Sequence, residues 1–156
     1  MNREEDNLYQ HVAEILEAAR SQVARSVNTA MVHAYWHVGR EIVEVEQRGE
    51  DRANYGEQLI TTLAARLGPS FGRGMSVVTL RRIRRFYLTY PKGTTIPRDI
   101  ESLEIRSTVL TELMYGSHVL FPTSLSWSHY LVLMRVQDDQ ARAFYEIEAV
   151  KEIYWI

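Results

Sequence analysis

Apolar side chains recur every three or four positions along much of the chain, which is the period of an amphipathic α-helix. Over residues 8–27, the positions that follow this period are Leu8, Val12, Ile15, Leu16, Ala19, Val23 and Val27. A second run covers residues 29–47, and its apolar side comprises Met31, Tyr35, Val38, Ile42 and Val45, with Trp36 and Val43 beside them. Two such helices joined by a short connection would pack antiparallel. The pattern therefore predicts a long helical hairpin over residues 8–48.

The middle of the chain, residues 55–91, predicts two shorter helices and a connector. Apolar positions within residues 59–67 form the first helix, and Gly68-Pro69 is expected to stop it, because proline has no amide to donate. Ser76 is a suitable N-cap for the second helix, which is expected to end before Pro91. This order of elements is the outline of a helix-turn-helix, or winged-helix-like, segment. The connector expected here is longer than the usual turn of about three or four residues, so the likeness is loose.

Prolines and glycines make residues 91–125 less regular, with one short helix expected near residues 107–115. Helical periodicity returns over residues 126–154, where Ser126 is a candidate N-cap for one helix and Asp138 or Asp139 for the last. The sequence therefore predicts an all-α fold, a helical bundle of about six helices. Its 156 residues are expected to form a single domain, residues 1–156.

Composition narrows the classes of protein to consider. The chain has no cysteine, which excludes disulfides, thiolate zinc sites and cysteine nucleophiles. The first residues, MNREEDN, are charged where a secretory signal needs apolar side chains, and no run approaches the roughly 18 apolar residues of a membrane span. We therefore expect a soluble, cytoplasmic protein with no membrane partner.

The net charge of −2 hides three unlike segments. Residues 1–57 carry 11 acidic and 6 basic side chains, residues 58–98 carry 8 basic and no acidic ones, and residues 99–156 carry 9 acidic and 4 basic ones. A stretch of 41 residues without a carboxylate, in a chain that has 20 carboxylates, is typical of a surface that binds a polyanion.

The helix expected after Ser76 concentrates this positive charge. At about 100° per residue, one side of it is apolar and is expected to face the core, with Leu80, Ile83, Phe86, Tyr87 and Tyr90. Arg81, Arg82 and Arg85 fall on the opposite side, and Arg84 falls at the margin. The planar guanidinium group suits both phosphate and guanine. The candidate nucleic-acid-binding residues are Arg73, Ser76, Arg81, Arg82, Arg84 and Arg85.

Two other interpretations of the arginines stay open. No Asp or Glu lies three or four residues from any of the four, which argues against an ordinary solvated helix face of mixed charge. In the other interpretation, the acidic flanking segments fold back on the arginines, within one chain or across a homodimer. In that case the surface formed by these arginines, which we call the arginine face (Arg81, Arg82, Arg84 and Arg85), would mediate protein interaction or oligomerisation.

Other candidate sites are weaker. His33 and His37 have the spacing of two metal ligands on what is expected to be the polar side of their helix, but neither an HExxH motif nor a third ligand is present. FGRGMS lacks the GK[ST] ending of a phosphate-binding loop. We therefore expect no metal, no cofactor and no catalytic residue. Trp36, Trp127, Leu80, Ile83 and Phe86 are expected to be structural.

Four short stretches resemble the N-terminal domain of the bacterial YhcG-type proteins, a domain of unknown function. They are YWxxGRxI at residues 35–42, FGRG at 71–74, LRxxRxFY at 80–87 and LSWSHY at 125–130. The resemblance extends over about residues 10–155. In that family the domain usually precedes a PD-(D/E)XK nuclease domain. The resemblance thus implies that this part handles DNA recognition or assembly while the other part cuts.

The nuclease core itself is not expected here. It requires a (D/E)-x-K element, whereas Lys92 and Lys151 are preceded two residues earlier by Tyr90 and Ala149. We therefore expect a chain that is not an enzyme but a DNA-binding or targeting module, with double-stranded DNA as its partner. A protein-interaction or oligomerisation domain is the alternative.

Overall fold

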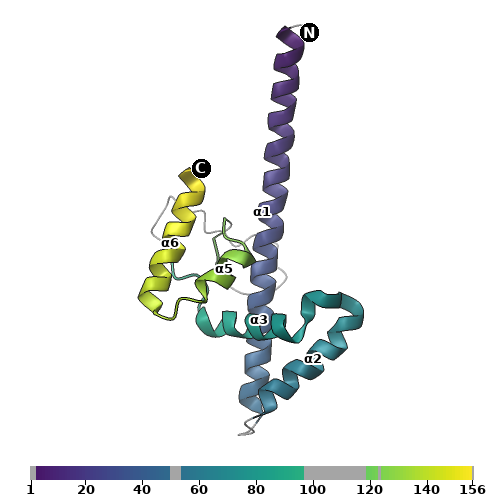
Figure 1. Ribbon diagram of the computed structural model, residues 1–156, viewed down its shortest axis with the longest axis vertical. Coiled ribbons are helices and arrows are strands. Elements are labelled where there is room, and N and C mark those ends of the chain that lie inside the picture. The colour runs from purple at the N-terminus through teal and green to yellow at the C-terminus, as the bar shows by residue number, and fades with distance from the viewer. Residues whose placement is uncertain (1–2, 50–53, 97–118, 123, 156) are drawn as a thin grey trace.

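The computed structural model describes residues 3–49, 54–96, 119–122 and 124–155. In these residues the chain forms five α-helices and one short 3-10 helix, without a β-strand, which confirms the all-α prediction (Figure 1). The short helix expected near residues 107–115 lies outside the described residues. None of the described helices combines the length and the apolarity of a membrane span.

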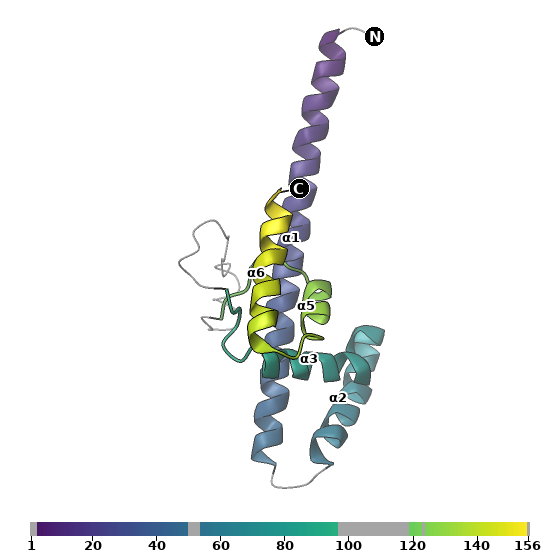
Figure 2. The ribbon, with the colours of Figure 1, turned by 60° about the vertical axis from the view of Figure 1, so that its left-hand side comes forward.

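The first helix, α1, runs without a break over Arg3–Arg48, so the predicted hairpin is wrong. No glycine or proline occurs between residues 8 and 38 to end a helix. At the expected junction, the Thr29 hydroxyl donates to the carbonyl oxygen of Arg25 at 2.9 Å, one turn back along the same helix. The N-terminal end of α1 projects beyond the other helices in both ribbon views (Figures 1 and 2).

Only the C-terminal half of α1 enters the core. Its buried residues are Thr29, Val32, His33, Trp36, Gly39, Ile42 and Val43. The buried side of α1 is therefore rotated around the helix from the side that periodicity predicted. Trp36 and Val43 lie within the buried surface, whereas Met31 is exposed. The apolar positions of the two halves lie on different sides of one helix, which is why the pattern resembled two helices.

The second helix, α2, covers Tyr55–Phe71 and includes Pro69, so the predicted stop at Gly68-Pro69 is wrong. Because Pro69 lies in the last turn, it removes a single backbone hydrogen bond near the helix end. The helix ends instead at Gly72, whose φ of 63° is a left-handed conformation and whose amide donates to the Gly68 carbonyl. The 3-10 helix η1, Gly72–Met75, then joins α2 to the next helix.

The third helix, α3, covers Val77–Thr89 and crosses α1 (Figure 1). Ser76 is its N-cap as predicted, since the Ser76 hydroxyl accepts a hydrogen bond from the Thr79 amide at 3.3 Å. At the other end of α3, the Trp36 indole donates to the Tyr90 carbonyl at 2.7 Å. This buried hydrogen bond fixes the end of α3 against α1.

Two further helices, α5 (Trp127–Leu133) and α6 (Asp139–Trp155), complete the described fold. The Asp138 carboxylate accepts from the Ala141 amide at 2.8 Å, so Asp138 caps α6. Aromatic rings from α1, α3 and α5 meet in one cluster, with Phe86 contacting Trp127 and Tyr130 at ring-centroid distances of 5.1 Å each. Trp36, Leu80, Ile83 and Phe86 are buried, as expected for structural residues, and Trp127 is half-buried and packs against the core.

Candidate nucleic-acid interface

The α3 helix presents its arginines outward, as the periodicity predicts. Leu80, Ile83 and Phe86 are fully buried between α3 and the core. Arg81, Arg82 and Arg85 are exposed, and Arg84 is half-buried at the margin. The packing of the apolar side therefore determines which way the positive charge points.

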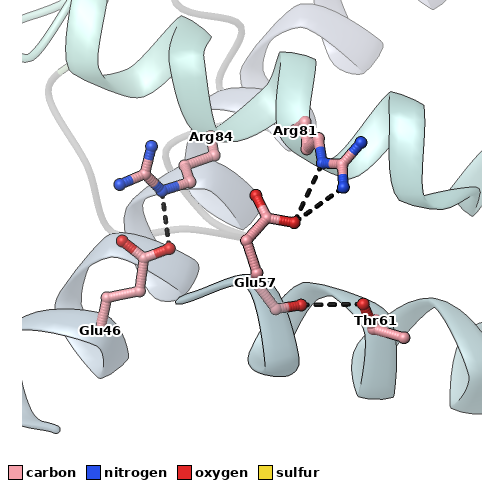
Figure 3. A network of polar contacts seen from close by, with 5 residues as sticks. All are labelled: Glu46, Glu57, Thr61, Arg81 and Arg84. Atoms are coloured by element: carbon pink, nitrogen blue, oxygen red, sulfur yellow. Dashed lines mark hydrogen bonds and ion pairs between the residues drawn. The ribbon is translucent and has the colours of Figure 1, made fainter. Parts of the chain in front are cut away.

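Two of the four arginines are already paired with carboxylates (Figure 3). Arg81 donates through Nη2 and Nε to Oε2 of Glu57 at 2.8 and 3.2 Å. Arg84 donates through Nε to Oε1 of Glu46 at 2.6 Å, and this hydrogen bond raises the pKa of Arg84. The partners lie 24 and 38 residues away in sequence, so a search of neighbouring positions could not find them.

The two ion pairs differ in exposure. The Arg81 and Glu57 side chains are 54% and 58% exposed, so solvent screens their attraction. Glu46 is only 13% exposed, and its pair with Arg84 links α3 to the C-terminal half of α1. Arg84 thus has a structural partner, whereas Arg81 remains accessible to another anion.

Arg85 is also engaged within the fold. Its Nη2 atom donates to the carbonyl oxygen of Met134 at 2.6 Å. Met134 is the C-cap of α5, where a cation favourably meets the negative end of the helix dipole. Arg85 therefore stabilises the packing of α5 against α3.

Arg73 and Arg82 are the two candidate arginines that make no hydrogen bond or ion pair with any described residue. Both are exposed, Arg73 in η1 and Arg82 on α3. Ser76, between them in sequence, uses its hydroxyl to cap α3. The predicted set thus divides into two unpaired arginines, one exposed but paired arginine, a helix cap and two arginines with structural contacts.

The histidine pair does not form the polar surface that the sequence suggested. His33 is fully buried, with Nδ1 2.8 Å from the Thr29 carbonyl oxygen and its ring against the edge of Phe121. Burial lowers the pKa of His33, although hydrogen bonds with the backbone of Thr29 and Val119 oppose this effect. No group of three potential metal ligands occurs in the part of the chain that the structure describes.

The sequence did not predict the polar cluster around the buried side chain of Glu146. The fully buried Glu146 carboxylate accepts hydrogen bonds from the hydroxyls of Thr94, Thr95 and Tyr130 at 2.5, 2.6 and 3.2 Å. Burial, followed by the charge of Glu146, raises the pKa of Tyr130 well above its usual range. One signal in the sequence indicated that Glu146 faces inward. It lies one helical turn before Val150, an apolar residue of the last helix.

Comparisons with known proteins identify a family. Residues 11–155 match the DUF1016 N-terminal domain. The chain is 33% identical over 159 residues to a protein of Escherichia coli (strain K12) named "Putative nuclease YhcG", an alignment that covers 92% of this chain and 40% of that protein. This chain therefore spans less than half the length of that relative. No solved structure matches the chain.

Proposed function

Because this chain belongs to the family of the DUF1016 N-terminal domain, we propose that it is a non-catalytic module that binds double-stranded DNA. Its relative is named a nuclease, and an enzyme that cuts nucleic acid needs a means of engaging it. Cleavage itself would belong to the part of the relative that this chain does not cover. The module would place that activity on its substrate.

The observation that carries this proposal is the exposed guanidinium of Arg82 on α3, which pairs with no described residue and lies next to the accessible Arg81. Arg73 adds a second unpaired guanidinium from η1, within the stretch of 41 residues that lacks carboxylates. Arginine binds phosphate oxygens and the guanine edge in bidentate fashion. Two arginines that have no partner among the described residues can engage phosphates without first breaking any contact between those residues.

The arrangement of α2, η1 and α3 supports a helix-turn-helix-like mode of binding. Since α2 continues to Phe71, the connector shortens to the four residues of η1 and the N-cap Ser76. In that mode the second helix enters the major groove and its N-terminal residues contact the bases. Arg81 and Arg82 would then contact the DNA, while Arg84 and Arg85 hold α3 in place.

A salt titration of DNA binding tests the proposal. We expect the chain to bind a duplex with log K falling against log salt by about 0.9 for each phosphate neutralised. Arg73→Ala/Arg82→Ala should flatten this slope by roughly two units, because two phosphate contacts are lost. The matched control is Arg25→Ala/Lys151→Ala, which removes the same charge from exposed positions on α1 and α6. Equal weakening by both double variants, or no binding by the parent chain, contradicts the proposal.

A second function is favoured by the Arg81–Glu57 pair. In this exposed contact, an arginine of the α3 helix binds a carboxylate group. An acidic surface on a protein partner would be bound in the same way, which is the protein-interaction alternative. If Arg73→Ala/Arg82→Ala leaves DNA binding intact but changes the apparent mass in solution, the arginine face serves protein association.

A further inference from the structure

The N-terminal half of α1 leaves an apolar surface uncovered. No residue from 3 to 28 is buried, and the first buried position is Thr29. Leu8, Ile15 and Val23 are 65%, 67% and 63% exposed, which is unusual for large aliphatic side chains gathered on one helix. Both ribbon views show the N-terminal end of α1 projecting beyond α5 and α6 (Figures 1 and 2).

The spacing of the apolar positions is self-complementary. We define the α1 stripe as Leu8, Val12, Ile15, Leu16, Ala19 and Val23. Successive members are separated by four, three, one, three and four residues, a series that reads the same in both directions. An antiparallel copy centred between Ile15 and Leu16 would therefore place Leu8 level with Val23 and Val12 level with Ala19. Every apolar side chain of the stripe meets an apolar side chain of the second copy.

The position of the stripe around α1 leaves room for a second helix. At about 100° per residue, the centre of the stripe lies about 130° around the helix from the centre of the face that packs into the core. A copy seated on the stripe approaches away from the helices that cover residues 29–43. In an antiparallel pair, the two helical bodies also lie at opposite ends of the shared segment.

Charge favours the same orientation. The first turn of α1 carries Glu4, Glu5 and Asp6, whereas Arg20 lies towards the other end of the projecting half. An antiparallel pair brings the acidic end of each copy alongside the basic end of its partner. A parallel pair would instead bring the three carboxylates of one copy next to those of the other, which is unfavourable.

We propose that the α1 stripe binds a second copy of this chain in an antiparallel helix pair. Burial of the exposed leucine, isoleucine and valine side chains provides the favourable free energy of association. The pairing segment is residues 3–28, in which residue 3 of one copy lies level with residue 28 of the other. This inference concerns a surface separate from the arginine face and does not depend on DNA binding.

Sedimentation equilibrium of the 156-residue chain tests the association. We expect a dimer of twice 18.2 kDa that dissociates on dilution. Ile15→Glu/Leu16→Glu should weaken association at least about tenfold, because two charges enter the centre of the apolar contact. The matched control is Ser21→Glu/Ala24→Glu, which adds the same charge to exposed positions on the other side of α1. A monomer at all concentrations overturns the proposal, as does equal weakening by the two variants.

Disulfide cross-linking tests the orientation, since the natural chain contains no cysteine. In the antiparallel pair, two Leu8→Cys copies place their cysteines about 22 Å apart along the axis, beyond the reach of a disulfide. Leu8→Cys alone and Val23→Cys alone should therefore not cross-link, whereas an equilibrated mixture of the two should form a mixed disulfide. Cross-linking by either variant alone, or its absence from the mixture, overturns the antiparallel pairing.

Discussion

Gly39 of α1 lies directly against the backbone of Ile83 in α3. A Cβ atom at position 39 would stand 2.5 Å from the Ile83 carbonyl oxygen and 2.9 Å from Cβ of Tyr87. Real Cβ atoms do not approach a backbone oxygen so closely, and neither neighbour is the flexible end of a side chain. The crossing of α1 and α3 therefore requires a glycine at this position, and this crossing orients the arginines of α3.

We expect Gly39→Ala to destabilise the fold by about 1 to 3 kcal/mol, the usual cost of overpacking a core. In an exposed helix the same change stabilises by up to about 1 kcal/mol, because alanine has the higher helix propensity. Gly68→Ala in α2 is the matched control, since a Cβ there meets nothing within 4 Å. Urea unfolding should move the midpoint down for Gly39→Ala and leave it unchanged or raised for Gly68→Ala. A raised midpoint for Gly39→Ala would contradict the close crossing.

Periodicity predicted elements that depend on local sequence and missed contacts between distant parts of the chain. The Ser76 cap and the two sides of α3 were predictable because a cap and a stripe are set by residues within a few turns. The pair of Arg84 with Glu46 was not, because helix packing brings together residues 38 positions apart. The hairpin prediction failed for a related reason: Thr29 lies where one apolar stripe ends and another begins, and a single helix accommodates both.

Replacing Glu57 should change the affinity for DNA in the opposite direction to replacing the arginines. Its carboxylate lies 2.8 Å from Arg81 and is 58% exposed, so it would repel a phosphate that approaches this arginine. We expect Glu57→Gln to strengthen DNA binding at low salt, with the difference shrinking as salt screens the charge. Fluorescence anisotropy with a labelled duplex measures the effect, and Glu17→Gln, at a 73% exposed position on the projecting half of α1, is the control. Weaker binding by Glu57→Gln than by the control would show that Arg81 needs its carboxylate to be positioned.

His33 predicts loss of stability in mild acid. Burial lowers its pKa below the ordinary value of 6.5, so the folded state holds the neutral ring while the unfolded chain takes up a proton. His37 is shifted in the same direction, by its burial and by the charges of His33 and Arg40. Stability is present above pH 6.5 and is lost as pH falls through the lowered values. Each such histidine contributes a slope of at most about 1.4 kcal/mol per pH unit.

Urea unfolding at several pH values between 7 and 5 measures this slope. We expect His33→Gln to be less stable than the parent chain at pH 7 but to lose less further stability on acidification, because glutamine does not titrate. The comparison is of slopes, so the absolute cost of the substitution does not affect it. Parallel curves for the parent and His33→Gln would mean that the His33 ring is protonated equally in the folded and unfolded states.

Glu146 is expected to be among the most sensitive positions of the fold. Its carboxylate receives three hydroxyl donors and, at 3.4 Å, the Thr95 amide, so it joins the segment after α3 to α5 and α6. Glu146→Ala removes the shared acceptor and leaves the buried Tyr130 hydroxyl and the half-buried Thr94 hydroxyl without it, which should cost about 1 to 3 kcal/mol. Glu146→Gln keeps one acceptor oxygen and the shape of the side chain, and should cost less.

Glu148→Ala is the control on the same helix, because its 3.4 Å contact with Lys151 is partly exposed and should contribute no more than about 1 kcal/mol. Urea unfolding of the three variants should therefore rank Glu146→Ala as the least stable, Glu146→Gln next and Glu148→Ala closest to the parent chain. The order matters more than the absolute values, since all three changes lie within two residues on α6. If Glu146→Ala unfolds at the same urea concentration as Glu148→Ala, the carboxylate does not hold the segment after α3 against α6.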